Sequence, residues 1–189
     1  MIVVKSKKDS IAKIKQMGLN SFPQEVFEVG DLKGIKKFVD KYPNESFIMR
    51  SANKAKGDFF FVANYDEVIE KLSCFEEEVT ISVSMAPYKE DIVLLGDIVV
   101  KRGGGSEIVD ITARNDENAT HRNIYEKPKY NFHTTLEDDR LWDISGFGKL
   151  ISYIADHELY DVIIEFVVYD CKVGINKENV VICEIRTGY

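Results

Sequence analysis

The 189-residue chain has little of what marks an exported, zinc-binding or disordered protein. Its three cysteines form no Cys-x-x-Cys pair and its three histidines share no ligand spacing, which argues against a disulfide framework and a zinc knuckle. No apolar run approaches the roughly 20 residues that cross a bilayer, and the N-terminus lacks the pattern of a signal peptide. Four prolines against 11 Phe and 9 Tyr argue against low-complexity disorder. The sequence therefore predicts a soluble globular protein of the cytoplasm with no membrane partner.

Charge is divided unevenly along the chain. Residues 1–57 hold 12 Lys and Arg against 6 Asp and Glu, whereas residues 58–189 hold 13 against 26, within a total net charge of −7. A basic front on an acidic body is consistent with chance, with a nucleic-acid arm, or with two lobes around one ligand in which cations hold phosphates and carboxylates hold a metal. The aromatic residues are not interleaved with the basic ones as a stacking platform for bases requires, so the sequence argues against a nucleic-acid partner.

The pattern of apolar residues changes along the chain. Helical spacing and strand-like runs alternate in the first part, and strand-like runs dominate the second. Helices are expected at 9–17, 31–41, 64–72 and 146–157, and strands at 25–29, 46–50, 58–62, 79–84, 91–100, 108–113, 162–168 and 180–186. Residues 101–106 predict a hairpin turn, with a phosphate-covering flap as the alternative, and residues 114–140 predict polar, irregular chain. The order of elements predicts an α+β fold in two lobes.

Two glutamates lie inside the last two apolar strands. Glu165 and Glu184 should be buried there, and a buried carboxylate needs a cation or a hydrogen-bond donor. If the hairpin that joins these strands is symmetric, Glu165 faces Glu184, and the repulsion between them disappears when Mg²⁺ bridges both carboxylates. Alternatively the register differs, or Arg186, two residues on and on the same face, neutralises Glu184 in a structural ion pair.

Other side chains carry weaker signals. Arg50 ends the apolar run 47–49, and a cation there is expected to meet an anion, whereas His121 is expected in a solvated loop. Trp142 is expected in the core or at the junction of the lobes, and the three phenylalanines of 59–61 in the core. No Ser or Cys has a convincing base near it in the sequence, so nucleophilic catalysis has no specific support.

Four segments, taken in order, resemble one family. They are the strand and loop 47–52 (Phe-Ile-Met-Arg-Ser-Ala) with Gly57, the stretch 79–87 (Val-Thr-Ile-Ser-Val-Ser-Met-Ala-Pro), and the strands 164–166 (Ile-Glu-Phe) and 183–186 (Cys-Glu-Ile-Arg). Together they resemble the nucleotide-gripping strand and loop, the adenine hinge and the closing metal-binding strands of the ATP-grasp family. The pairing Arg50-Ser51 is most similar to the phosphoenolpyruvate-synthase-like branch.

The resemblance implies a two-lobed ATP-grasp-like domain, with a nucleotide-gripping lobe at 1–84 and a metal-binding lobe at 85–189. Each lobe would be a largely antiparallel sheet with helices on one face, and ATP would lie between the lobes. In the implied site, Glu165 and Glu184 hold Mg²⁺, and Arg50 and Arg186 are catalytic. The phosphates are bound by Arg50, Lys56 and Gly57, and the adenine edge is read by Ser84, Met85 and Ala86. Family members usually carry Asn at the position of Arg186, and a separate N-terminal substrate domain, which a homo-oligomer or a partner chain could supply here.

Two functions follow from the resemblance. The first is an ATP-dependent ligase or phosphotransferase that uses Mg-ATP and acts on a small carboxylate-type substrate. In that enzyme the metal and Arg50 would offset the charge of the transferring phosphoryl group. The alternative is a nucleotide-binding or regulatory module that has lost catalysis.

Overall fold

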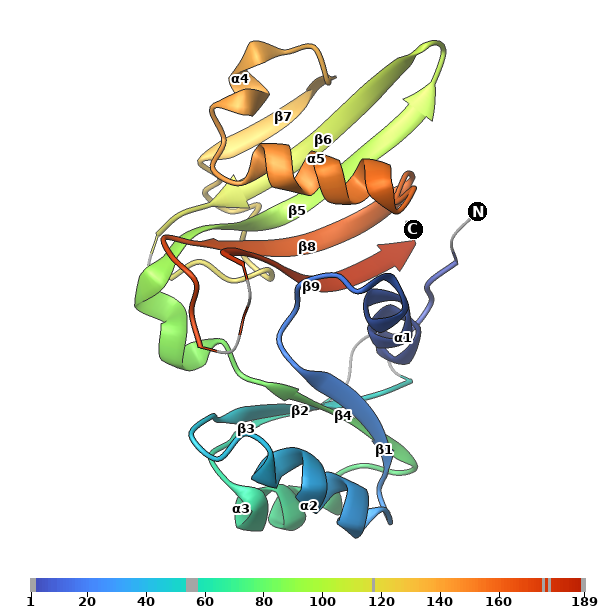
Figure 1. The fold of residues 1–189 in the computed structure, drawn as a ribbon, viewed down its shortest axis with the longest axis vertical. Helices are drawn as coiled ribbons and strands as arrows, with labels where there is room; N and C mark the ends of the chain where they lie inside the picture. The colour runs from blue at the N-terminus through green and yellow to red at the C-terminus, as the bar shows by residue number, and fades with distance from the viewer. Residues whose placement is uncertain (1–2, 54–57, 117, 175, 177, 188–189) are drawn as a thin grey trace.

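Two antiparallel sheets form the framework of the computed structural model, which describes residues 3–53, 58–116, 118–174, 176 and 178–187. The sheets have four and five strands and face each other, with most helices on their outer sides (Figure 1). The expected α+β fold of two lobes, each an antiparallel sheet with helices on one face, is confirmed. Within the described residues, no helix combines the length and the apolar character needed to span a membrane.

The four-stranded first sheet has the order β1-β4-β2-β3. Its strands are β1 (Gln24–Glu28), β2 (Phe47–Ser51), β3 (Phe59–Val62) and β4 (Glu78–Val83), and its helices are α2 (Leu32–Asp40) and α3 (Tyr65–Leu72). Asp31 and Asn64 cap the two helices, each accepting a backbone N–H with its side chain. Phe47 and Met49 pack in the core that α2 and α3 cover. Strand alternation therefore turns Arg50 to the other side, toward the second sheet.

The five-stranded second sheet has the order β7-β6-β5-β8-β9. Its strands are β5 (Ile92–Gly103), β6 (Ser106–Arg114), β7 (Tyr130–Thr135), β8 (Val162–Tyr169) and β9 (Val180–Thr187); the 3-10 helix η1 (Ala86–Asp91) leads into it, and α4 (Asp139–Trp142) and α5 (Phe147–Asp156) follow β7. β5 and β6 form the hairpin expected around residues 101–106. Leu94 and Ile98 pack with α5 in one core, whereas Leu95 packs in the other core with residues of the first sheet. The side that carries Leu95 is therefore the inner face of the second sheet.

The helix α1 (Lys7–Met17) lies beside β9, at the side of the molecule where the two sheets come together (Figure 1). A capping box begins it, because Ser6 accepts the N–H of Asp9 and the Asp9 carboxylate accepts the N–H of Ser6. Gly18 ends it with φ 64°, a left-handed conformation that glycine adopts without a steric penalty. α1 is thus part of the first lobe by sequence and packs on the second sheet. The division into lobes at 1–84 and 85–189 stays a prediction.

Three expectations from the sequence are wrong in detail. The stretch 114–140 is not irregular throughout, because it contains β7 and the start of α4. β7 is an edge strand that alternates aromatic and polar residues, and this pattern predicts a strand less clearly than an apolar run does. Trp142 is 53% exposed, although its ring meets Phe147 edge-on. Phe59 and Phe61 are exposed because alternate side chains of the edge strand β3 leave the core.

Candidate functional site

A row of polar side chains crosses all five strands of the second sheet. Strand pairing places these residues directly opposite one another from β7 to β9: Asn131, Thr112, Asp97, Glu165 and Glu184. Directly opposed residues point to the same side of a sheet, and this side is the inner face. Asp97, Glu165 and Glu184, called here the carboxylate row, thus bring three carboxylates onto adjacent strands.

A β-bulge at Cys183 completes the carboxylate row. Phe166 pairs with Ile182, and the next pair along β8 joins Glu165 to Glu184, so that β9 contains one extra residue at this point. Without the bulge, Glu165 would face Cys183, and Glu184 would point to the opposite side of the sheet. The expected opposition of the two glutamates is therefore found, but the bulge produces it rather than a symmetric hairpin.

Arg186 bridges two of the three carboxylates. Its Nη2 lies 3.0 Å from Oδ2 of Asp97 and 3.2 Å from Oε1 of Glu165. The side chains of Asp97 and Glu165 are 6% and 16% exposed, so the guanidinium neutralises charges that little water reaches. The sequence had suggested only Glu184 as the partner of Arg186.

Glu184 receives a cation from α1. Nζ of Lys7 lies 2.5 Å from Oε2 of Glu184, and the two side chains are 21% and 17% exposed. The next residue, Lys8, contacts Oε1 of Glu78 on β4 at 2.5 Å. The start of α1 therefore joins the two sheets through neighbouring ion pairs, one of which ends on the carboxylate row.

His121 lies against the carboxylate row from the segment between β6 and β7. Its Nδ1 is 3.4 Å from Oδ1 of Asp97 and 4.0 Å from Oε2 of Glu165. The expectation of a solvated loop is wrong for this side chain, which is 15% exposed. Burial opposes the charged imidazole, but interactions with Asp97 and the Cys183 thiol outweigh it and raise the pKa of His121 to about 10. Tyr125 of the same segment donates its hydroxyl to Asp97 at 3.2 Å.

The carboxylate row does not fit Mg²⁺ in this arrangement. Magnesium needs open carboxylate oxygens in near-octahedral geometry and keeps several waters, whereas each carboxylate here already contacts a side-chain cation. In the part of the chain that the structure describes, no group of three His, Cys, Asp or Glu side chains is arranged to hold a metal ion. Burial raises the pKa of Glu165, against the lowering effect of His121 and Arg186. The magnesium role of Glu165 and Glu184 stays a prediction that this arrangement does not support.

On the first sheet, Arg50 lies on the inner face. It pairs directly with Phe59 of β3, whose side chain is exposed on the same face. The guanidinium of Arg122, from the segment between β6 and β7, stacks over the Phe59 ring at 4.5 Å from its centroid. Arg122 therefore covers the ring of Phe59, and Arg50 is the cross-strand neighbour of Phe59 on the same face. Lys56 and Gly57, also expected at the phosphates, lie outside the described residues.

The expected adenine hinge joins the two sheets. The buried Ser84 donates its N–H to the carbonyl of Ser46 at 2.7 Å, and its hydroxyl accepts the N–H of Ala86 at 3.1 Å. The carbonyl of Met85 accepts the N–H of Tyr88 in η1. These groups already hydrogen-bond within the chain, so adenine recognition at the hinge stays a prediction.

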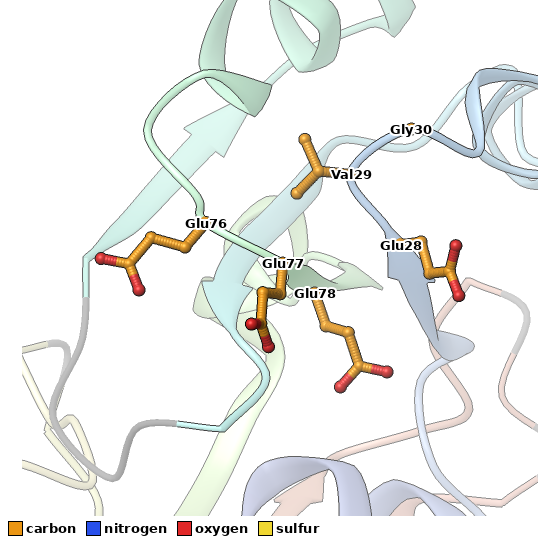
Figure 2. A pocket seen from close by; sticks show the side chains of 6 residues that line it. All are labelled: Glu28, Val29, Gly30, Glu76, Glu77 and Glu78. Atoms are coloured by element: carbon orange, nitrogen blue, oxygen red, sulfur yellow. The ribbon is translucent and has the colours of Figure 1, made fainter.

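A hollow gathers acidic side chains where β1 ends and β4 begins. It is lined by Glu28, Val29, Gly30, Glu76, Glu77 and Glu78 (Figure 2). In Figure 2 the four carboxylates point in different directions rather than at a common point. A metal site requires carboxylates that converge, so the arrangement of this hollow does not suit a metal ion.

Sequence reasoning missed three members of the site. Asp97 carries the signal that identified the glutamates, a carboxylate inside an apolar strand, and that signal could have found it. Lys7 lies in the first turn of an amphipathic helix and His121 in a polar segment, and no local pattern distinguishes them from solvated residues.

The solved structures that resemble this chain along nearly its whole length include the following three. D-alanyl-alanine synthetase A from Vibrio cholerae aligns with 97% of this chain and 55% of its own, at TM-score 0.60 and 11% identity. N5-carboxyaminoimidazole synthase from Aspergillus clavatus, in complex with ADP and 5-aminoimidazole ribonucleotide, aligns with 97% and 44%, at TM-score 0.59 and 12% identity. The macrocyclase MdnC from Microcystis aeruginosa, bound with precursor peptide MdnA, aligns with 97% and 52%, at TM-score 0.51 and 13% identity. No protein-family model and no curated protein matches the sequence.

The chain has the ATP-grasp fold. At identities of 11% to 13%, the likeness establishes the fold alone. The chain spans about half the length of the structures that it matches.

Proposed function

We propose that this chain binds ATP between its two sheets, with guanidinium groups of the inner faces holding the phosphates. The observation that carries the proposal is the stacking of Arg122 over Phe59, whose direct cross-strand neighbour on the same face is Arg50. Guanidinium groups bind phosphate oxygens bidentately, so two arginines beside the same ring offer a phosphate site. The likeness to structures solved with ADP or ATP supports the same choice.

In this proposal both lobes contribute to the nucleotide site. Residues 1–84 grip the nucleotide, and residues 85–189 form the opposite wall. Lys56 and Gly57 follow Arg50 closely in the sequence and assist at the phosphates. The backbone of 84–86 lies where the chain crosses between the sheets and borders the adenine.

An ATP-dependent ligase or phosphotransferase acting on a small carboxylate is the second candidate. The fold shared with D-alanyl-alanine synthetase A and N5-carboxyaminoimidazole synthase favours it. The contacts of the carboxylate row favour binding without catalysis, because Lys7 and Arg186 lie where a phosphoryl-transfer enzyme would hold its metal. Release of ADP from ATP in the presence of small carboxylates and amines would favour the enzyme.

Calorimetric titration of ATP tests the proposed binding. We expect wild-type protein to bind ATP with a Kd on the order of micromolar, and Arg50→Gln to bind at least about tenfold more weakly. Arg140→Gln is the matched control, since this arginine is 68% exposed and pairs with Asp138 beside α4. The proposal is wrong if ATP gives no saturable heat, or if Arg50→Gln binds as tightly as the wild type.

A further inference from the structure

The carboxylate row and its neighbours form a balanced set of charges. Three carboxylates lie on adjacent strands, and directly opposed like charges destabilise a sheet. Two permanent cations, Lys7 and Arg186, lie within salt-bridge distance of these carboxylates. His121, from the segment between β6 and β7, contacts Asp97 as well. The chain itself thus supplies the positive charge that the row requires.

Arg186 holds the position of a bridging cation. One nitrogen, Nη2, contacts both Asp97 and Glu165, as a metal ion shared by two carboxylates would. Its backbone is fixed in β9, where it pairs with Ile163 across β8. Arg186 therefore reaches the row from a rigid element and needs no loop movement to stay there.

Lys7 is held almost as firmly at the other end of the row. The Oγ of Ser10 accepts the N–H of Ile185 at 2.8 Å, a buried hydrogen bond that ties α1 to β9 next to Glu184. Figure 1 shows α1 running beside this strand. The capping box at Ser6 fixes the first turn, from which Lys7 extends.

A divalent cation at the row would have to displace both side chains. It would add two positive charges where the carboxylates are already neutralised, and it would break the ion pairs of Lys7 with Glu184 and of Arg186 with Asp97 and Glu165. Magnesium also demands octahedral oxygen ligands and retains several waters, whereas each of these carboxylates already contacts a side-chain cation. The internal cations therefore compete directly with a metal.

We propose that Lys7 and Arg186 take the place of a divalent cation at the carboxylate row, so that nucleotide binding in this chain is independent of Mg²⁺. Mg²⁺-independent nucleotide binding rests on the proposed function, whereas the replacement of the metal by the two side chains does not depend on nucleotide. The ligand class is a nucleoside di- or triphosphate in its metal-free form, whose phosphates contact the guanidinium groups of the inner faces.

Titration with Mn²⁺ alone tests the replacement, with free Mn²⁺ measured by electron paramagnetic resonance. We expect no saturable binding to the wild type below about 1 mM, the range of weak carboxylate sites. Lys7→Gln/Arg186→Gln frees the carboxylates and should bind at least about tenfold more tightly. The control is Lys101→Gln/Arg102→Gln, which removes one lysine and one arginine charge from exposed ion pairs at the β5–β6 hairpin and should bind Mn²⁺ as the wild type does.

Wild-type protein that binds Mn²⁺ at one site, lost in Glu165→Gln, would overturn the proposal. So would a folded Lys7→Gln/Arg186→Gln variant that binds Mn²⁺ no better than the wild type. If circular dichroism shows that the double variant does not fold, Lys7→Gln replaces it, because this change removes only the partner of Glu184. The wild-type titration still decides the question in that case.

Titration of ATP in excess Mg²⁺ and in EDTA tests whether nucleotide binding is independent of Mg²⁺. We expect the two affinities to agree within about twofold. Binding that disappears in EDTA overturns the inference and leaves the proposed nucleotide binding intact. Absence of binding under both conditions overturns the proposed function, and the Mn²⁺ titration then judges the cation replacement by itself.

Discussion

Replacing Arg186 by methionine measures how far the stability of the fold depends on the internal cation. Arg186→Met keeps a long unbranched side chain but removes the charge next to Asp97 and Glu165, which are 6% and 16% exposed. Removing one partner of a buried ion pair costs about 3–5 kcal/mol, and of an exposed pair roughly 0.2–1 kcal/mol. Because Arg186 is itself 32% exposed, we expect a loss between these limits, about 2 kcal/mol in the free energy of unfolding.

Urea denaturation followed by circular dichroism measures this loss directly. In a thermal scan it corresponds to a Tm lower by roughly 4–8 °C for a chain of this length. The control is Arg102→Met, which removes a 56% exposed guanidinium from a 3.5 Å contact with Glu107 and should cost less than about 1 kcal/mol. Adding Asp97→Asn to Arg186→Met should cost less than Asp97→Asn in the wild type, because the ion pair between Asp97 and Arg186 is then already lost.

Equal losses in Arg186→Met and Arg102→Met would refute the reasoning. The carboxylate row would then not depend on the guanidinium for neutralisation, and the case for an internal cation would fail with it. Strict additivity of Arg186→Met and Asp97→Asn would lead to the same conclusion, since residues in direct ionic contact should couple.

Two further predictions concern stability. The pKa of His121 is raised from 6.5 to about 10 in the folded chain, so the stabilisation that its charge gives should be complete below pH 6.5 and disappear as the pH rises through about 10. The Tm difference between wild type and His121→Gln should therefore shrink over this range. A difference that stays constant would contradict the prediction. Phe166→Ala empties a fully buried position and should lower the free energy of unfolding by about 3–5 kcal/mol in urea, whereas Phe61→Ala, at a 61% exposed position, should change it by less than about 0.5 kcal/mol; similar losses in the two variants would show that the core is wrongly assigned.

The order of helices and strands could be predicted because the strands of the two cores are apolar runs between polar segments. Phe47–Met49 of β2 are all buried, and in β5 Leu94 and Ile98 pack in one core while Leu95 packs in the other, so each run contrasts with the polar chain beside it. β7 lacks this contrast, because as an edge strand it packs its aromatic side chains only partly into the core. Its pairing with β6, and not its own pattern, makes it a strand.

The side chains that complete the site come from segments whose position depends on the whole fold. Ile124 is fully buried among residues of both sheets and holds the polar segment between β6 and β7 against the inner face, where His121 meets the carboxylate row. A single apolar residue in a polar stretch does not reveal this, because its burial depends on how closely the two sheets approach. Lys7 is likewise placed by the packing of α1 on β9, a contact between opposite ends of the chain.

The pairing of Glu165 with Glu184 shows how a register can be right for a different reason. A regular β9 would carry Glu184 into the core beneath α5 and turn Ile185 toward the polar inner face, because side chains alternate with a period of two. Burying a carboxylate without a partner costs several kcal/mol, and the bulge at Cys183 avoids that cost by changing the phase of the strand. The structure accordingly places both Ile182 and Ile185 in the same core, three residues apart rather than two. This break in the apolar alternation is present in the sequence, and it is the sign from which the bulge, and with it the carboxylate row, could have been predicted.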